Sequence, residues 1–322
     1  MKRIIAYLLG VMLVVGLLAG PAAADEAKKY KVAFLPTDMS MTFASWLADE
    51  MAKEFAKYPD LELTTIDSKN VLNDQIANME NCMTQGYDYI ILLPIDPTAE
   101  DPYVEGYIRE GKPFMMINLD DLGVEKASSV IANPYDLGTV VATYAKTLLP
   151  EDAKVVVLLG PSGNTDSIER RRAYEDIIFS KMKGVKILEE QIGDWEKSKG
   201  LNFMNDWLQK YGNDGITAVL SMNDAMAIGA YEAAKDADAK DLLFFGVDGL
   251  ADAAVSINEG GLKASALQDA QVMAREAARV VHEVLTGENK AGFEKVQIPV
   301  TLITKDNVAE FIDRYTKSGM LK

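Results

Sequence analysis

Side chains that form directional hydrogen bonds follow several short apolar runs in this sequence. Asn223, Asp248 and Gln268 each come at the end of such a run, and Arg170 lies one to two turns into the segment that follows another. Arginine donates a planar fork of hydrogen bonds, an ionised aspartate only accepts them, and asparagine and glutamine do both. This combination is typical of a site for a small uncharged molecule with many hydroxyl groups, such as a sugar or a polyol.

Two aromatic residues and two further polar residues complete the predicted site. Phe43 and Trp195 offer ring faces on which the C–H groups of such a ligand can pack. Asp38 and Asn118 follow apolar runs in the first half of the chain. The predicted ligand-binding residues are therefore Asp38, Phe43, Asn118, Arg170, Trp195, Asn223, Asp248 and Gln268.

Each of these residues also has a structural interpretation. Asp248 can cap the helix that follows it, because aspartate is a favoured N-cap residue, but we expect it to bind ligand. For Asp224 we expect the capping role. Phe43 and Trp195 can be core residues, and Arg170 stands in a run of arginines of the kind that usually forms a solvated helix face.

Catalysis and metal binding are not expected. The sequence contains one histidine, His282, in a predicted helix away from the polar clusters, and one cysteine, Cys82. A Ser–His or Cys–His pair would have to recruit that histidine, and a zinc site needs more ligands of these types. We therefore expect a binding protein without catalytic residues, metal or cofactor.

An alternation of strands and helices must position the predicted site. Apolar runs such as 32–35, 89–93 and 155–159 alternate with segments whose apolar residues lie three or four positions apart. This rhythm is typical of an α/β fold with doubly wound parallel sheets. About ten strands are too many for one compact sheet, so we expect two lobes with a break near Asn133. We expect residues 296–303 to form one strand, at an edge or in a crossing segment because it contains Pro299.

The first 24 residues are expected to be a cleaved signal peptide. Lys2 and Arg3 precede an apolar run over 4–18, and small residues then suit cleavage before Asp25. Removing Lys2 and Arg3 leaves 31 basic and 49 acidic residues, a net charge of −18. Such a charge repels nucleic acid and anionic lipid. We expect an exported protein, periplasmic or extracellular, that binds no nucleic acid.

Five motifs carry a resemblance to a known family. They are Gly160-x-x-Gly163 with Glu169-Arg170, Gln191-x-x-Asp194-Trp195, residues 221–230, Gly246-Val247-Asp248-Gly249 and residues 264–268. In this order and spacing, the sequence resembles the periplasmic sugar-binding proteins of the ribose-binding type over nearly all of the chain after the signal peptide. The resemblance implies a type I periplasmic binding protein fold, in which two lobes are joined by a three-segment hinge.

The resemblance also implies lobe boundaries, a function and roles for residues. The lobes would be residues 25–133 plus 269–299 and residues 134–268 plus 300–322. The protein would be a monomer that captures a sugar or polyol between its lobes and delivers it to the membrane permease of an ABC transporter. Residues at family ligand-binding positions are Arg170, Trp195, Asn223, Asp248 and Gln268, and Phe43 matches a stacking position.

The first lobe departs from the ribose pattern, and other functions use the same fold. Leu93-Pro94 and Asn118-Leu119 replace an Asn-Pro and an Asp-Arg pair, so another sugar, a polyol or a less polar molecule stays open as the ligand. The protein could instead report its ligand to a chemoreceptor or a sensor kinase. A sugar-responsive repressor would begin with a basic DNA-binding segment, and a hydrolase would turn its ligand over; we expect neither.

Overall fold

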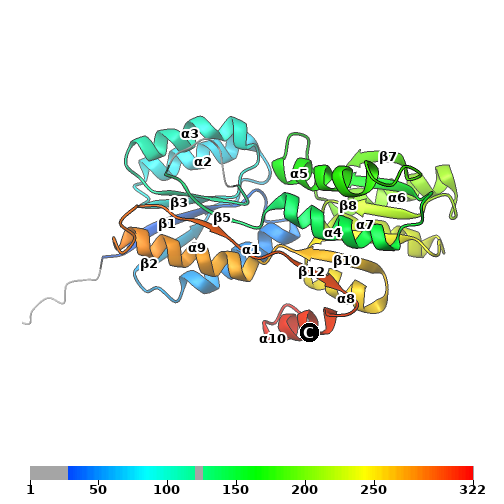
Figure 1. Cartoon of the computed structure of the whole chain (residues 1–322). Helices are drawn as coiled ribbons and strands as arrows, with labels where there is room; N and C mark the ends of the chain where they lie inside the picture. Colours follow the sequence, from blue (N-terminus) through cyan, green and yellow to red (C-terminus); the bar gives the residue numbers. More distant parts are fainter. Residues whose placement is uncertain (1–27, 120–125, 322) are drawn as a thin grey trace, which may run out of the picture.

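The computed structural model describes residues 28–119 and 126–321, and the predicted signal peptide lies outside them. Within these ranges, no helix combines the length and apolar character that a membrane crossing requires. The chain forms two α/β lobes side by side, each built on a six-stranded sheet (Figure 1). The predicted fold class of two doubly wound, largely parallel sheets is confirmed.

The sheet of the first lobe has the strand order β11-β5-β4-β3-β1-β2, and all its pairs are parallel. Its strands are β1 (Tyr30–Leu35), β2 (Leu61–Thr65), β3 (Tyr89–Leu92), β4 (Phe114–Ile117), β5 (Ser128–Ile131) and β11 (Lys295–Gln297). Strands β3, β4 and β5 are buried along their whole length, as expected for parallel strands with helices on both faces.

The sheet of the second lobe has the order β12-β10-β9-β8-β6-β7. Its pairs are parallel except the pair of β10 with β12, which is antiparallel. Its strands are β6 (Lys154–Leu159), β7 (Lys186–Ile192), β8 (Ala218–Ser221), β9 (Leu243–Asp248), β10 (Leu262–Leu267) and β12 (Thr301–Thr304).

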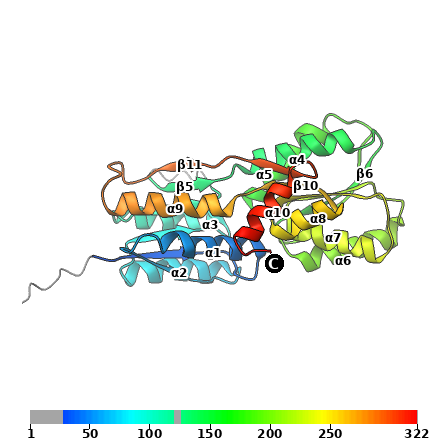
Figure 2. The same cartoon turned by 90° about the horizontal axis from the view of Figure 1, so that it is seen from below.

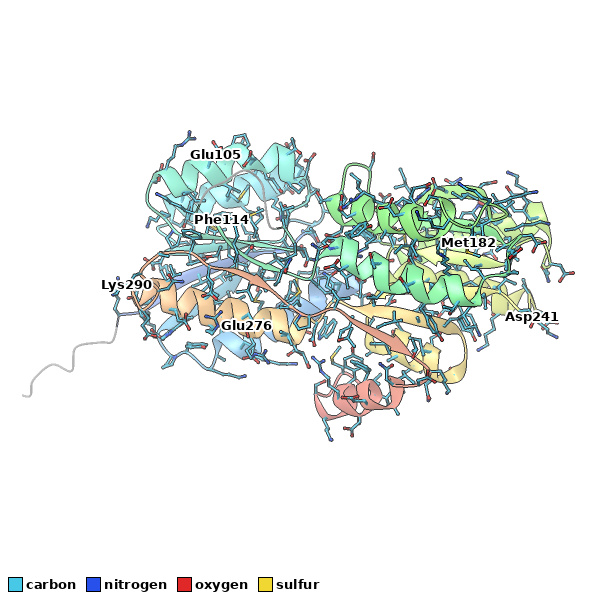
Figure 3. The ribbon with its side chains drawn as sticks, in the orientation of Figure 1. Glu105, Phe114, Met182, Asp241, Glu276 and Lys290 are labelled. Atoms are coloured by element: carbon cyan, nitrogen blue, oxygen red, sulfur yellow. The ribbon has the colours of Figure 1, made fainter. Side chains whose placement is uncertain are left out.

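Helices cover both faces of the first sheet. Helices α2 (Leu72–Thr84) and α3 (Pro97–Arg109) lie on one face, and α1 (Thr42–Phe55) and α9 (Ala270–Leu285) on the other (Figure 1). Figure 3 shows Phe114 of β4 beneath α3 and Glu105 on the outer side of that helix. The Phe114 ring meets Tyr107 of α3 edge-on at 5.7 Å between centroids, so α3 is fixed to the sheet by an aromatic contact.

The second lobe has six α-helices among its described residues. They are α4 (Pro134–Leu148), α5 (Thr165–Tyr174), α6 (Lys197–Tyr211), α7 (Asp224–Asp236), α8 (Ala251–Glu259) and α10 (Val308–Lys317). Helices α6 and α7 approach each other closely at Gly200 and Gly229. A Cβ at Gly200 would lie 2.3 Å from the Met226 carbonyl oxygen, and one at Gly229 would lie 2.1 Å from the Lys197 carbonyl oxygen. These glycines therefore allow the two helices to pack closely against each other.

The chain passes between the two sheets at three places: after β5, after β10 and after β11. Residues 296–303 cross between the sheets, which was one of the two predicted alternatives, but the prediction of one continuous strand over these residues is wrong. Residues 298–300 separate β11 from β12, which belong to different sheets. Pro299 has no N–H to continue a ladder, which explains the interruption. The lobe boundaries of 25–133 plus 269–299 and 134–268 plus 300–322 are our proposal on this basis.

Helix α10 lies at the junction of the lobes (Figure 2). The Arg314 guanidinium donates to the two carboxylate oxygens of Asp269 at 2.7 and 2.5 Å, and Asp269 is the N-cap of α9. The Tyr315 hydroxyl donates to the Gly249 carbonyl oxygen. The last helix therefore fastens one of the crossings to the second lobe.

Candidate functional site

A cavity of about 80 Å³ lies where the two lobes face each other. The first lobe contributes Thr37, Met41, Thr42, Phe43, Ala44, Leu93, Pro94 and Asn118. The second lobe and the crossing after β10 contribute Asn164, Asp166, Arg170, Trp195, Asn223, Ala225, Asp248, Leu250 and Gln268. The first lobe thus supplies a largely apolar wall and the second lobe a largely polar one.

The carboxyl ends of the parallel strands supply much of the polar lining. Asn118 follows β4, Asn223 follows β8, Asp248 is the last residue of β9, and Gln268 follows β10. In open α/β sheets, ligand sites lie beyond these strand ends. Because the strand ends of both sheets reach one cavity, the fold gathers residues that are far apart in the sequence.

Arg170 on α5 is the centre of the hydrogen-bond network and is 3% exposed. Its guanidinium donates to the Met222 carbonyl oxygen at 2.7 Å and to the Gln268 side-chain oxygen at 2.5 Å. Carboxylate oxygens of Asp248 and Asp166 lie 3.6 and 3.8 Å from its nitrogens. Its Nε has no hydrogen-bond partner among the described residues. The guanidinium is therefore held in place, and one buried N–H of the group bonds to no described residue.

Asp248 is buried beside Arg170. Burial raises the pKa of its carboxyl to about 7, the Arg170 charge lowers it, and the Asp166 charge raises it again. A carboxyl with this pKa exists in both protonation states near neutral pH, so it can accept or donate a hydrogen bond. Its φ of 123° lies in a region that is costly for residues other than glycine and is found mainly at functional sites.

Asn223, and not Asp224, caps helix α7. The Asn223 side-chain oxygen accepts from the Met226 N–H at 3.0 Å and caps α7, so the prediction that Asp224 caps this helix is wrong. One Asp224 carboxylate oxygen accepts from the Leu250 N–H at 2.9 Å and from the Ser265 hydroxyl at 2.8 Å. Asp224 therefore connects the loop after β9 to β10.

The cap leaves part of the Asn223 amide for a ligand. Its Nδ2 donates to the Trp195 carbonyl oxygen at 3.1 Å, while its Oδ1 accepts from Met226. An amide group has two N–H donors and two acceptor lone pairs. One donor and one lone pair remain, so capping and ligand binding are compatible at this residue.

Trp195 reaches the cavity through an uncommon backbone conformation. Its φ is 66°, in the left-handed region that bulky residues rarely adopt. A Cβ at Gly160 would lie 2.1 Å from the indole Cζ2, so the ring occupies space that only glycine leaves free. The Arg170 guanidinium carbon lies 5.6 Å from the indole centroid. The ring is thus set between Gly160 and Arg170.

Phe43 at the start of α1 begins a chain of ring contacts. It meets Trp46 edge-on with 6.3 Å between centroids. Trp46 in turn meets Tyr315 of α10 edge-on at 6.1 Å. Ring contacts therefore lead from the cavity wall of the first lobe to the last helix of the second.

Asn118 and Asp166 meet across the cavity from opposite lobes. Burial raises the pKa of Asp166, while the Arg170 charge and a hydrogen bond from the Asn118 side chain lower it. Asn118 is 6% exposed and has a φ of 62°, which asparagine tolerates better than most residues. Its side-chain oxygen has no hydrogen-bond partner within the described ranges.

The structure brings seven of the eight predicted residues to the cavity and leaves out Asp38. The Asp38 carboxylate accepts from the Ser40 N–H at 2.7 Å in the turn before α1. Asn164 and Asp166 line the cavity and were missed by the sequence analysis. The signal for Asp166 was its position four residues before Arg170, which places both side chains on the same face of a helix.

Comparison with known proteins places the chain in a family. The model of the periplasmic binding protein domain matches residues 32–289. A putative rhizopine-binding protein of Rhizobium meliloti is 30% identical over 267 residues, which cover 80% of this chain and 85% of that protein. The ribose import binding protein RbsB of Bacillus subtilis is 27% identical over 270 residues, which cover 84% and 86%.

A solved structure shares both the fold and some of the sequence. It is the ABC transporter solute binding protein of Bacillus halodurans with bound myo-inositol, with a TM-score of 0.83 and 26% identity. The match covers 90% of this chain and all of that one. The family match, the relatives and the two-lobe structure agree, and the chain belongs to the periplasmic binding protein family.

Proposed function

We propose that this protein captures a sugar or polyol in the cavity between its lobes and delivers it to the membrane permease of an ABC transporter. The observation that carries the proposal is the buried Arg170, which is fixed by Met222 and Gln268 and keeps an N–H without a partner among the described residues. Asp248 and the free part of the Asn223 amide lie on the same cavity wall. Such a set matches hydroxyl groups that donate and accept.

The relatives support this function. Their names include ribose import binding proteins and a xylitol-binding protein of Mycolicibacterium smegmatis, and the Bacillus halodurans structure holds myo-inositol. These relatives are named for binding, which agrees with a site without a catalytic role. We further propose that the protein reaches the periplasm, or the outside of the cell, through a signal peptide cleaved before Asp25.

Binding is proposed to close the lobes. Arg170, Asn223 and Asp248 belong to the second lobe, and Phe43 and Asn118 to the first, so a ligand contacts both lobes together only when they meet. A ligand shifts the lobes toward the closed form only by binding that form more tightly. The permease would then recognise the closed, loaded protein.

A thermal-shift screen of sugars and polyols tests the function. A ligand at one hundred times its dissociation constant should raise the free energy of unfolding by about 2.7 kcal/mol. Asp248→Ala should weaken binding of the best ligand at least about tenfold, because it removes a buried hydrogen-bond partner. Asp252→Ala, at an exposed carboxylate in the first turn of α8, should not change binding. The absence of any stabilising sugar or polyol would refute the proposed function.

A further inference from the structure

The cavity holds more acidic than basic side chains. Among its lining residues Arg170 is the one cation, and the carboxyl groups of Asp166 and Asp248 lie beside it. Asp224 does not line the cavity but is fully buried next to Asp248, and burial and the Asp248 charge raise its pKa. One guanidinium therefore lies beside the two carboxyl groups that line the cavity.

Arg170 offsets this charge only in part. Its hydrogen bonds go to the Met222 carbonyl and the Gln268 amide, and its distances of 3.6 and 3.8 Å to the two carboxylates are longer than hydrogen bonds. Burial raises the pKa of Asp248 to about 7 and also raises that of Asp166. Raised pKa values favour the protonated, uncharged form of these carboxyl groups, whereas a cationic group on the ligand would favour their ionised form and pair with it.

Hydrogen-bond acceptors gather at the corner of the cavity formed by Asp166 and Asn118. The Asp166 carboxyl is 18% exposed and accepts a hydrogen bond from the Asn118 amide. The Asn118 oxygen is buried without a partner among the described residues. Leaving such an acceptor unpaired in a buried site is unfavourable.

An ammonium group suits this corner better than a hydroxyl group. A hydroxyl has one hydrogen to donate, whereas an ammonium has three and no acceptor of its own. It could donate to the Asp166 carboxylate and to the Asn118 oxygen together, and these come from opposite lobes. The acidic chain would also attract a cation from a distance.

We propose that the preferred ligand is an amino sugar or amino polyol, whose ammonium group binds between Asp166 and Asn118 while its hydroxyl groups meet Arg170, Asn223 and Asp248. This inference rests on the proposed function and narrows it to one chemical class. The ammonium group would connect the two lobes, so it would contribute directly to the stability of the closed form.

Isothermal titration with matched ligand pairs tests the inference. The pairs are glucose with glucosamine, galactose with galactosamine, and myo-inositol with a monoamino inositol, in a buffer that keeps the amines protonated. In at least one pair, the amine should bind at least about tenfold more tightly than its hydroxyl partner. Asp166→Asn should abolish this preference. Asp136→Asn, which changes an exposed first-turn acid of α4, should keep it.

A second variant covers the case in which Asp166→Asn does not fold. Asn118→Asp keeps a residue type that tolerates a positive φ and adds a negative charge at the same corner, so the amine preference should increase at least about threefold.

Three results would overturn the inference. Equal affinities within every pair would remove the ammonium site and leave the proposed function standing. A preference that survives Asp166→Asn would place the amine elsewhere in the cavity. Failure of every compound to bind would remove the proposed function together with the inference.

Discussion

Gly160→Ala is the sharpest test of how the cavity is built, because it changes the site without touching a polar group. The added Cβ would lie 2.1 Å from Cζ2 and 2.2 Å from Cη2 of the Trp195 indole, whereas ordinary contacts begin at 3.4 Å. The ring must therefore retreat by about 1.3 Å. Since the Trp195 backbone is already in the left-handed region and its carbonyl accepts from Asn223, the shift should disturb both the ring face and the amide.

The expected loss of affinity is one to two orders of magnitude, or about 1.4–2.8 kcal/mol. The expected loss of stability is about 1–3 kcal/mol, the usual cost of overpacking. Gly106→Ala is the control: it lies inside α3, where the nearest atom to the new Cβ is the flexible end of Arg109 at 4.0 Å. It should leave binding unchanged and raise stability by up to about 1 kcal/mol.

The assay is titration with the sugar or polyol that stabilises the wild-type protein most, together with urea unfolding of each variant. A double-mutant cycle tests whether the effect of Gly160→Ala on binding acts through the Trp195 ring. Once Trp195→Ala has removed the ring, Gly160→Ala should have little further effect on binding. A folded Gly160→Ala protein that binds within about twofold of the wild type would refute the assignment of the indole to the ligand site.

Three further changes test the energetics of single buried or paired groups. Burial raises the pKa of Glu100 from 4.5 to about 8, so wild-type stability should fall as pH rises through this range. Glu100→Gln should remove that fall and raise the free energy of unfolding at pH 8, measured with urea, by about 1–3 kcal/mol. If the stability of the variant and of the wild type changed with pH in parallel, this prediction would be contradicted. Hydrogen bonds, of which that from Lys210 has the largest effect, lower the pKa of Glu189 from 4.5 to about 2. The ionised Glu189 therefore stabilises the fold above pH 4.5, and this stabilisation is lost as the pH falls to 2. Glu189→Gln should lower the free energy of unfolding by about 1 kcal/mol at neutral pH and leave it unchanged near pH 2. A stability difference between variant and wild type that does not depend on pH would rule this out. Gly246→Ala would place a Cβ 2.1 Å from an Asp224 carboxylate oxygen and should lower stability by about 1–3 kcal/mol, which an unchanged melting temperature would disprove.

The strand ends could be predicted because they depend on local patterns. Buried parallel strands appear as short apolar runs, and their carboxyl ends meet at one edge of a sheet. Asn118, Asn223, Asp248 and Gln268 follow from this rule alone, and all four line the cavity. The same rule could not separate Asp38 from them, because the turn before α1 directs its carboxylate to the Ser40 N–H.

Other features depend on contacts between distant segments. The partner of Asp224 is Ser265, 41 residues away, and no local pattern distinguishes that connection from a helix cap. Asp166 faces Asn118 only because the two lobes meet. The break between β11 and β12 could have been predicted from Pro299, since a proline within a strand pattern argues against one continuous strand.

The ring pair of Trp46 and Tyr315 has a practical consequence. The two rings come from α1 of the first lobe and α10 of the second, and they touch edge-on within the interior. Light emission from an indole changes with the polarity of its surroundings, so we expect movement of one lobe against the other to change the fluorescence of Trp46. We expect part of the intrinsic fluorescence, to which the three tryptophans of the sequence contribute, to report opening and closing without an added dye.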